Sequence, residues 1–182
     1  ETVTNDISGT VMFSKLTYTK ADTYTYTIKE TNVGAPGWTY APDVTVTVVV
    51  TDNGNGTLEV TPTYSTGGNT AGTFKNTYAA EGSVILKAQK SVVGSTLTDG
   101  QFEFKLYDGI DDLIETVKND GSGAVEFAEL TYTAAGTYTY TIKETDAGAS
   151  GWTYASDVTV TVVVTDNGDG TLEATPTYSI GG

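Results

Sequence analysis

An amine, two carboxyls and a carboxamide occupy positions where the alternation of side chains along a strand would turn them toward an apolar face. These residues are Lys90, Glu30, Glu144 and Asn76. Each belongs to a series of apolar side chains spaced two residues apart: Val84, Leu86 and Ala88 before Lys90, Tyr24, Tyr26 and Ile28 before Glu30, Tyr138, Tyr140 and Ile142 before Glu144, and Phe74 and Tyr78 around Asn76.

Burying such groups is costly unless they meet one another. Burial disfavours the charged forms and so favours a neutral amine beside a protonated acid. The amine could then attack the carboxamide carbon of Asn76, while a glutamate polarises the carbonyl and moves protons as ammonia leaves. Contact within one folded domain gives the rate advantage of an intramolecular reaction. The product would be an amide cross-link between two strands.

An ordinary structural explanation competes with this chemistry. Lys90 and Glu30 each lie near the end of an expected strand, where a side chain can reach solvent or form a salt bridge at the rim. The residue pattern by itself leaves both explanations open.

The elements that would position these residues are strands. Threonine alternates with valine over residues 44–51 and with tyrosine over residues 23–28, which gives one apolar and one threonine-rich face. Turn sequences separate the strands, as at residues 52–56 and 119–123. No window has helical spacing with caps. This pattern predicts an all-β fold of two antiparallel sheets packed face to face.

The sequence repeats with a period of 114 residues. Residues 1–68 match residues 115–182 at all but 15 positions, and the offset relates Glu30 to Glu144 and Trp38 to Trp152. A period of this length is that of a domain rather than of a solenoid. We therefore expect residues 1–79 to be the C-terminal part of a first sandwich whose first strands are missing. Residues 80–182 would be a second sandwich that lacks its last strand.

Composition excludes several function classes. A net charge of −14 argues against nucleic acid and anionic membranes as partners. Without histidine or cysteine there is no basis for zinc sites, disulfides or Cys–His catalysis, and we expect no cofactor or metal. The acidic hairpin at residues 165–170 does not have EF-hand spacing and is expected to be a tight turn. Trp38 and Trp152 are expected in the sandwich core.

Six segments resemble the pilin isopeptide-linkage domains of streptococcal T-antigen-type major pilins and related Gram-positive surface proteins. They cover residues 88–94, 99–104, 130–132, 136–144, 158–162 and 74–78. The resemblance implies tandem Ig-like (CnaB-like) β-sandwich domains in which a first-strand lysine bonds to a last-strand asparagine with help from a glutamate. By motif, these roles fall on Lys90, on Asn76, and on Glu30 and Glu144.

Neither complete triad is expected within one domain of this chain. The spacing places the asparagine partner of Lys90 near position 190 and the lysine partner of Asn76 before Glu1. We therefore expect both ends to fall inside a domain of a longer repeat array. Strand donation between chains, which would make the cross-link intermolecular, is the alternative.

The resemblance implies a non-enzymatic structural module of a pilus, fimbria or adhesin stalk on the cell wall of a Gram-positive bacterium. Its partners would be neighbouring repeats or identical subunits, with a host ligand at a distant tip. An adhesin module that binds a host glycan or protein is the alternative function. The near-identical repeats argue against this alternative, because ligand sites tend to lie on specialised tip domains.

Overall fold

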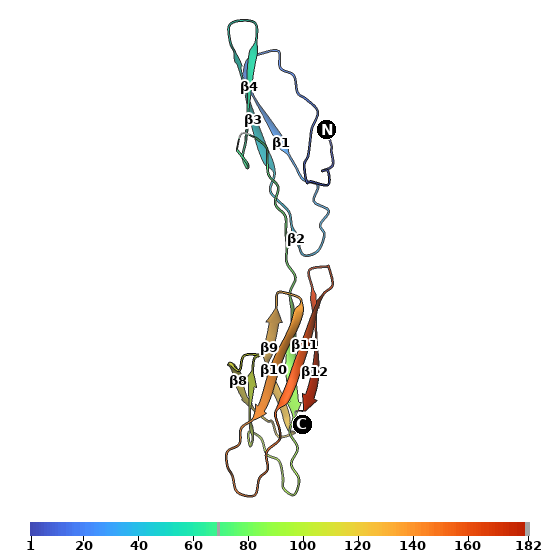
Figure 1. Ribbon diagram of the computed structural model, residues 1–182, viewed down its shortest axis with the longest axis vertical. Helices are drawn as coiled ribbons and strands as arrows, with labels where there is room; N and C mark the ends of the chain where they lie inside the picture. Colours follow the sequence, from blue (N-terminus) through green and yellow to red (C-terminus); the bar gives the residue numbers. More distant parts are fainter. Residues whose placement is uncertain (69, 181–182) are drawn as a thin grey trace. The chain divides into compact units, whose positions relative to one another are not determined.

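The computed structural model describes residues 1–68 and 70–180, and this part of the chain contains strands and no helix. Every strand pairing is antiparallel, so the predicted all-β class is confirmed. The strands, labelled in Figure 1, are β1 (Asp22–Ile28), β2 (Trp38–Thr39), β3 (Val44–Asp52), β4 (Leu58–Tyr64), β5 (Thr77–Tyr78), β6 (Gly82–Gln89), β7 (Glu103–Tyr107), β8 (Leu113–Lys118), β9 (Ala124–Tyr132), β10 (Gly136–Glu144), β11 (Val158–Asp166) and β12 (Leu172–Ile180).

The chain forms two compact units. Unit 1 comprises Glu1–Val33 and Tyr40–Asn76, and unit 2 comprises Gly34–Thr39 and Thr77–Gly182. No helix in the described residues is long and apolar enough to cross a membrane.

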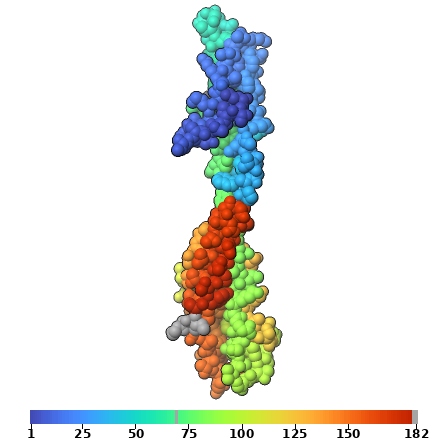
Figure 2. All heavy atoms as spheres, turned by 90° about the vertical axis from the view of Figure 1, so that its right-hand side faces the viewer, coloured from blue at the N-terminus to red at the C-terminus, as the bar shows by residue number. Residues whose placement is uncertain are grey.

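Unit 2 is a two-layer sandwich. One layer is a five-stranded sheet in the order β12-β11-β10-β7-β8, and the other is the pair β6-β9. The core between them takes side chains from both layers, among them Leu86, Phe127, Leu106, Ile142 and Val162. At one edge of the sandwich β6 lies beside β12, and Figure 2 shows the green surface of β6 next to the red surface of β12.

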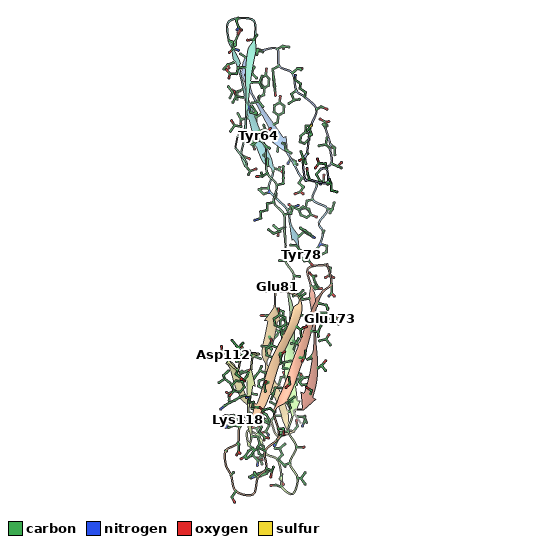
Figure 3. All side chains as sticks on the ribbon, viewed as in Figure 1. Tyr64, Tyr78, Glu81, Asp112, Lys118 and Glu173 are labelled. Atoms are coloured by element: carbon green, nitrogen blue, oxygen red, sulfur yellow. The ribbon has the colours of Figure 1, made fainter. Side chains whose placement is uncertain are left out.

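Unit 1 contains a three-stranded sheet in the order β1-β3-β4. Val46, Val48 and Val50 of β3 are buried, and partly buried side chains such as Tyr26 of β1 and Tyr64 of β4 pack against them. Tyr64 is labelled in Figure 3.

The period-2 pattern determines which side chains are buried in both units. In β3 the valines at positions 44, 46, 48 and 50 are buried, and Thr45 and Thr51 are exposed. The register pairs tyrosine with valine across β1 and β3, as in Tyr24 with Val48 and Tyr26 with Val46. The same pairs recur at Tyr138–Val162 and Tyr140–Val160 in unit 2. Aromatic and β-branched cross-strand pairs of this kind stabilise a half-buried sheet.

Candidate functional site

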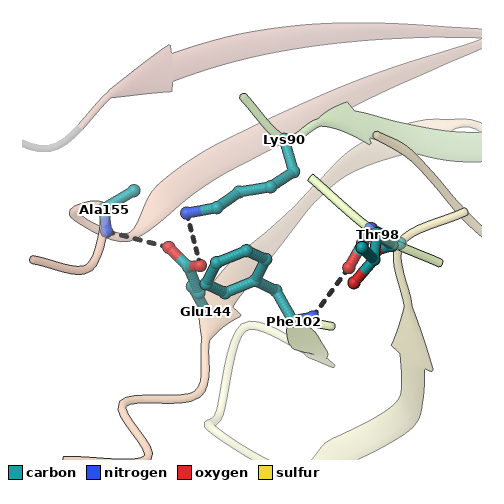
Figure 4. A network of polar contacts seen from close by, with 6 residues as sticks. Lys90, Thr98, Phe102, Glu144 and Ala155 are labelled. Carbon is teal, nitrogen blue, oxygen red and sulfur yellow. Dashed lines mark hydrogen bonds and ion pairs between the residues drawn. The ribbon is translucent and has the colours of Figure 1, made fainter. Parts of the chain in front are cut away.

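Unit 2 holds a buried ion pair between two of the residues singled out in the sequence. Lys90 directly follows β6, and Glu144 is the last residue of β10. The Lys90 Nζ atom lies 2.6 Å from Glu144 Oε1, and the two side chains are only 10% and 1% exposed. Figure 4 shows both side chains pointing toward one another between the strands. The prediction that Lys90 and Glu144 turn inward is therefore confirmed for this pair.

The aromatic rings of Phe102 and Trp152 lie on one side of the pair. The Lys90 Nζ atom lies 4.2 Å from the centre of the Phe102 ring, which is a cation–π contact. Trp152 meets Phe102 edge-on, with ring centres 5.2 Å apart. These rings keep water from the amine and the carboxylate, so the electrostatic interaction between them is less screened than at the surface.

Asn119 holds Phe102 in place, although from its sequence it is expected only as part of a turn. Its side chain is 2% exposed. Oδ1 accepts a hydrogen bond from the Phe102 N–H at 2.7 Å, and Nδ2 donates to the carbonyls of Thr98 and Asp120 at 2.9 and 2.7 Å. The available signal was the odd-numbered series of β8, in which Glu115 and Val117 are half-buried and Asn119 comes two residues after Val117.

A backbone amide completes the surroundings of Glu144. The Ala155 N–H donates to Glu144 Oε2 at 2.9 Å, as drawn in Figure 4. The other oxygen, Oε1, makes no hydrogen bond to the described residues, and its partner is the Lys90 ammonium group. The carboxylate is thus held from two sides by groups of positive or partly positive charge.

Unit 1 holds a different pair at the corresponding place. Asn76 Nδ2 donates to Glu30 Oε1 at 2.8 Å, and Asn76 Oδ1 accepts from the Ala41 N–H at 2.9 Å. Glu30 Oε2 is buried without a hydrogen-bond partner among the described residues. The carbonyl oxygen that a glutamate was expected to polarise therefore faces a backbone amide, and Glu30 lies at the amide nitrogen instead.

The repeat-related glutamates of the two units have different partners. The 114-residue offset relates Glu30 to Glu144 and Ala41 to Ala155. Unit 2 pairs this glutamate with a lysine, whereas unit 1 pairs it with an asparagine. Lys90 and Asn76 belong to different units, so within residues 1–68 and 70–180 neither unit brings these three residue types together around its glutamate.

The acidic hairpin at residues 165–170 and Trp38 are the two other features singled out in the sequence. No group of three or more acidic, histidine or cysteine side chains within residues 1–68 and 70–180 is arranged to hold a metal ion. Asp166 and Asp169 instead accept hydrogen bonds within their own hairpin, from the backbone N–H groups of Gly168 and Thr171. The expectation for Trp38 was wrong, because this side chain is 48% exposed and lies against Tyr78 outside the core.

A comparison with family models identifies the family of this chain. The model of the Spy0128-like isopeptide containing domain (FctA) matches residues 1–79 and 86–182. A search of curated proteins finds no match. Because the matched segments span nearly the entire sequence, the chain belongs to the family of Spy0128-like isopeptide-containing domains.

Proposed function

We propose that this chain is a structural module of a bacterial surface fibre whose repeats are locked by Lys–Asn isopeptide bonds. The family is one of pilin domains, which are structural rather than catalytic. The observation that carries the proposal is the buried Lys90–Glu144 pair, with 2.6 Å between amine and carboxylate. A buried ion pair gains little net stability over apolar residues of similar size, so a chemical role gives a reason for its presence.

The surroundings favour addition of the amine to the carboxamide carbon, followed by elimination of ammonia. A proton passes from the Lys90 ammonium group to Glu144 Oε1 across their 2.6 Å contact. The free amine then attacks the asparagine Cγ, and the electron pair of the carbonyl moves onto Oδ1. The intermediate collapses with cleavage of the Cγ–Nδ2 bond. Glu144 gives its proton to the departing nitrogen and takes one from the former amine.

This scheme balances without water or an added reagent. The ammonium group of Lys90 and one carboxamide become a secondary amide and ammonia, with one proton left on Glu144. The ammonia takes this proton and leaves as an ammonium ion, so Glu144 returns to its carboxylate form. The step occurs once in each domain, so it is a maturation event rather than enzymatic turnover. The roles proposed for unit 1 are the same. Glu30 would transfer the protons, Asn76 would be attacked, and the attacking lysine would come from another segment.

The packing of the segment that contains Asn76 in unit 1 supports a last strand at the corresponding place of unit 2. In unit 1 a Cβ added at Gly72 would lie 2.9 Å from Val44 Cγ1 and 3.3 Å from Tyr64 Cδ1, so the backbone of this segment packs closely on both side chains. Val44 is fully buried. Its counterpart Val158 is only half-buried in unit 2, and Tyr178, the counterpart of Tyr64, is 42% exposed.

A lengthened chain tests the proposal. A second copy of residues 69–80 placed directly after Gly182 continues the 114-residue period and brings the copy of Asn76 to position 190. We expect the intact mass of this chain to fall by about 17 Da, the mass of one ammonia. Digestion should yield one branched peptide that joins Lys90 to the copied asparagine.

Three variants of the lengthened chain serve as controls. Lys90→Met and replacement of the copied asparagine by alanine should each keep the full mass, whereas Lys87→Met should still lose ammonia because Lys87 is exposed. A full mass for the unsubstituted lengthened chain, with unit 2 folded, would refute the isopeptide mechanism.

A further inference from the structure

We propose that the backbone N–H of Ala41, and of its repeat counterpart Ala155, is the oxyanion donor of the cross-linking reaction. This inference rests on the proposed function, because it assigns a group to the intermediate of that reaction. Two groups then act on the carboxamide. The glutamate exchanges protons with its nitrogen, and a main-chain amide donates a hydrogen bond to its oxygen.

The orientation of Asn76 supports this separation. A backbone N–H can only donate a hydrogen bond, so the atom that faces Ala41 N at 2.9 Å must be the carbonyl oxygen Oδ1. The opposite side of the carboxamide then presents its NH₂ group to Glu30 Oε1 at 2.8 Å. When an amine attacks Cγ, negative charge develops on Oδ1, where the Ala41 N–H already points.

The second repeat shows the same N–H bound to a charged oxygen. The Ala155 N–H donates to Glu144 Oε2 at 2.9 Å in a unit that contains no asparagine at this place. The position is therefore suited to an oxygen that carries negative charge. On arrival of a carboxamide, this N–H would pass to the carbonyl oxygen and release Oε2 for the departing nitrogen. Unit 1 has the arrangement expected after this exchange.

The local sequence explains why this N–H is available. Ala41 and Ala155 each lie three residues before a strand, β3 or β11, so neither takes part in the ladder of that sheet. Pro42 follows Ala41 and restricts it to extended conformations. The neighbouring strand residues Val44 and Val46 are buried in the sheet, which fixes the start of the strand. A donor fixed before the reaction does not have to reorganise when charge appears.

Replacement of one amide by an ester tests the assignment. Lactic acid in place of Ala155 removes the N–H and keeps the side chain. The chain has no cysteine, so a lengthened chain can be joined at Gly148–Ala149 through a temporary cysteine that is later desulfurised to alanine. Ligation in denaturant keeps the chain unfolded and unreacted, and dilution into buffer starts folding and the reaction together.

The all-amide chain prepared in this way should lose ammonia in a first-order process measured by intact mass. The ester chain should react roughly 100-fold more slowly, which is the usual effect of removing one oxyanion donor. Its pH–rate profile should keep its shape, since Lys90 and Glu144 are unchanged. The all-amide Lys87→Met chain, which is changed only at an exposed side chain, should react at close to the full rate.

The possible results distinguish this inference from the proposed function. An ester chain that folds and reacts within threefold of the all-amide chain would overturn the oxyanion assignment and leave the isopeptide mechanism intact. A slow ester chain with a displaced pH–rate profile would also overturn it, because that result indicates a misplaced Glu144. Failure of the all-amide chain to react would overturn the proposed function, and this inference with it.

Discussion

At the scale of residues, the Lys90–Glu144 pair combines an unfavourable burial with a favourable contact. Each charge loses its hydration in the core, and the 2.6 Å contact with additional partners offsets this loss. The partners are the Phe102 ring for the ammonium group and the Ala155 N–H for the carboxylate. The pair is therefore stable only while all its members are present.

Removal of one member of the pair should be more damaging than removal of both. Glu144→Leu leaves a buried ammonium group unpaired and should lower the free energy of unfolding of unit 2 by about 3–5 kcal/mol. The double variant Lys90→Met/Glu144→Leu should return to within about 1 kcal/mol of the unsubstituted chain, since apolar residues of similar size often replace buried pairs without loss. Urea unfolding followed by tryptophan fluorescence measures the free energy of unfolding of the single and the double variant.

An exposed pair provides the comparison. Lys87 and Glu126 lie 2.7 Å apart, but their side chains are 61% and 56% exposed. Lys87→Met should change the free energy of unfolding by less than about 1 kcal/mol. Equal effects of Glu144→Leu and Lys87→Met would contradict the burial argument.

Asn119 should matter more for stability than its place in a turn suggests. Asn119→Ala leaves the Phe102 N–H and two carbonyls without their partner and should lower the free energy of unfolding by about 3 kcal/mol. Asn5, its repeat counterpart, is exposed and makes one side-chain hydrogen bond to the adjacent Asp6 carbonyl. Asn5→Ala should therefore change stability by less than about 0.5 kcal/mol. Urea unfolding of the two variants side by side tests the contrast.

At the scale of elements, local sequence produces the same turn in both repeats. Asp120 Oδ1 accepts hydrogen bonds from Ser122 and Ala124, and Asp6 Oδ1 accepts them from Ser8 and Thr10. The serine hydroxyl lowers the pKa of the aspartate in each case, followed by the backbone hydrogen bonds. The turn therefore forms whether or not the surrounding strands are the same.

The surroundings of this turn differ between the repeats, and glycine substitutions should reveal the difference. Gly123 and Gly9 both have positive φ angles, 88° and 83°. A Cβ at Gly123 would collide with the carbonyl oxygen of Lys90, whereas a Cβ at Gly9 would meet open space. Gly9→Ala should cost only backbone strain, about 1–2 kcal/mol. Gly123→Ala should cost clearly more and loosen the end of β6.

Hydrogen exchange can measure the two substitutions in one molecule. The amide of Val48 reports on unit 1, and that of Val162 reports on unit 2. We expect a larger loss of protection at Val162 in Gly123→Ala than at Val48 in Gly9→Ala. Equal losses would mean that the close approach to Lys90 has no energetic effect.

At the scale of the whole molecule, the proposed bond would stabilise a domain that has no disulfides. In the lengthened chain, a bond from Lys90 to position 190 closes a loop of about 100 residues. Closure of such a loop should raise the free energy of unfolding of unit 2 by about 4–5 kcal/mol through the lost entropy of the unfolded chain. The matched control replaces the copied asparagine by alanine, so that the strand is present and the bond is absent.

Thermal and urea unfolding of these two lengthened chains measure the effect of the bond itself. We expect a clear upward shift of both midpoints for the cross-linked chain. A cross-linked chain, verified by mass, that unfolds at the same midpoints as its control would show that the bond does not stabilise the domain. It would then serve some purpose other than stability.

The sequence by itself was sufficient for the all-β class, for the buried faces and for the inward direction of Lys90 and Glu144. These follow from period-2 alternation, because the geometry of a strand sends successive side chains to opposite faces regardless of the rest of the fold. Asn76 was likewise identified from its place between Phe74 and Tyr78, and its contact with Glu30 agrees with that placement. The assigned roles remain predictions.

Only the tertiary structure decided which groups meet and how they are oriented. The burial of Asn119, the exposure of Trp38 and the N–H of Ala155 at Glu144 depend on segments far apart in the chain. Alternation specifies a direction for each side chain but no partner, and a backbone amide has no signature in a sequence of side chains. The identity of the oxyanion donor could therefore be inferred only from three-dimensional contacts.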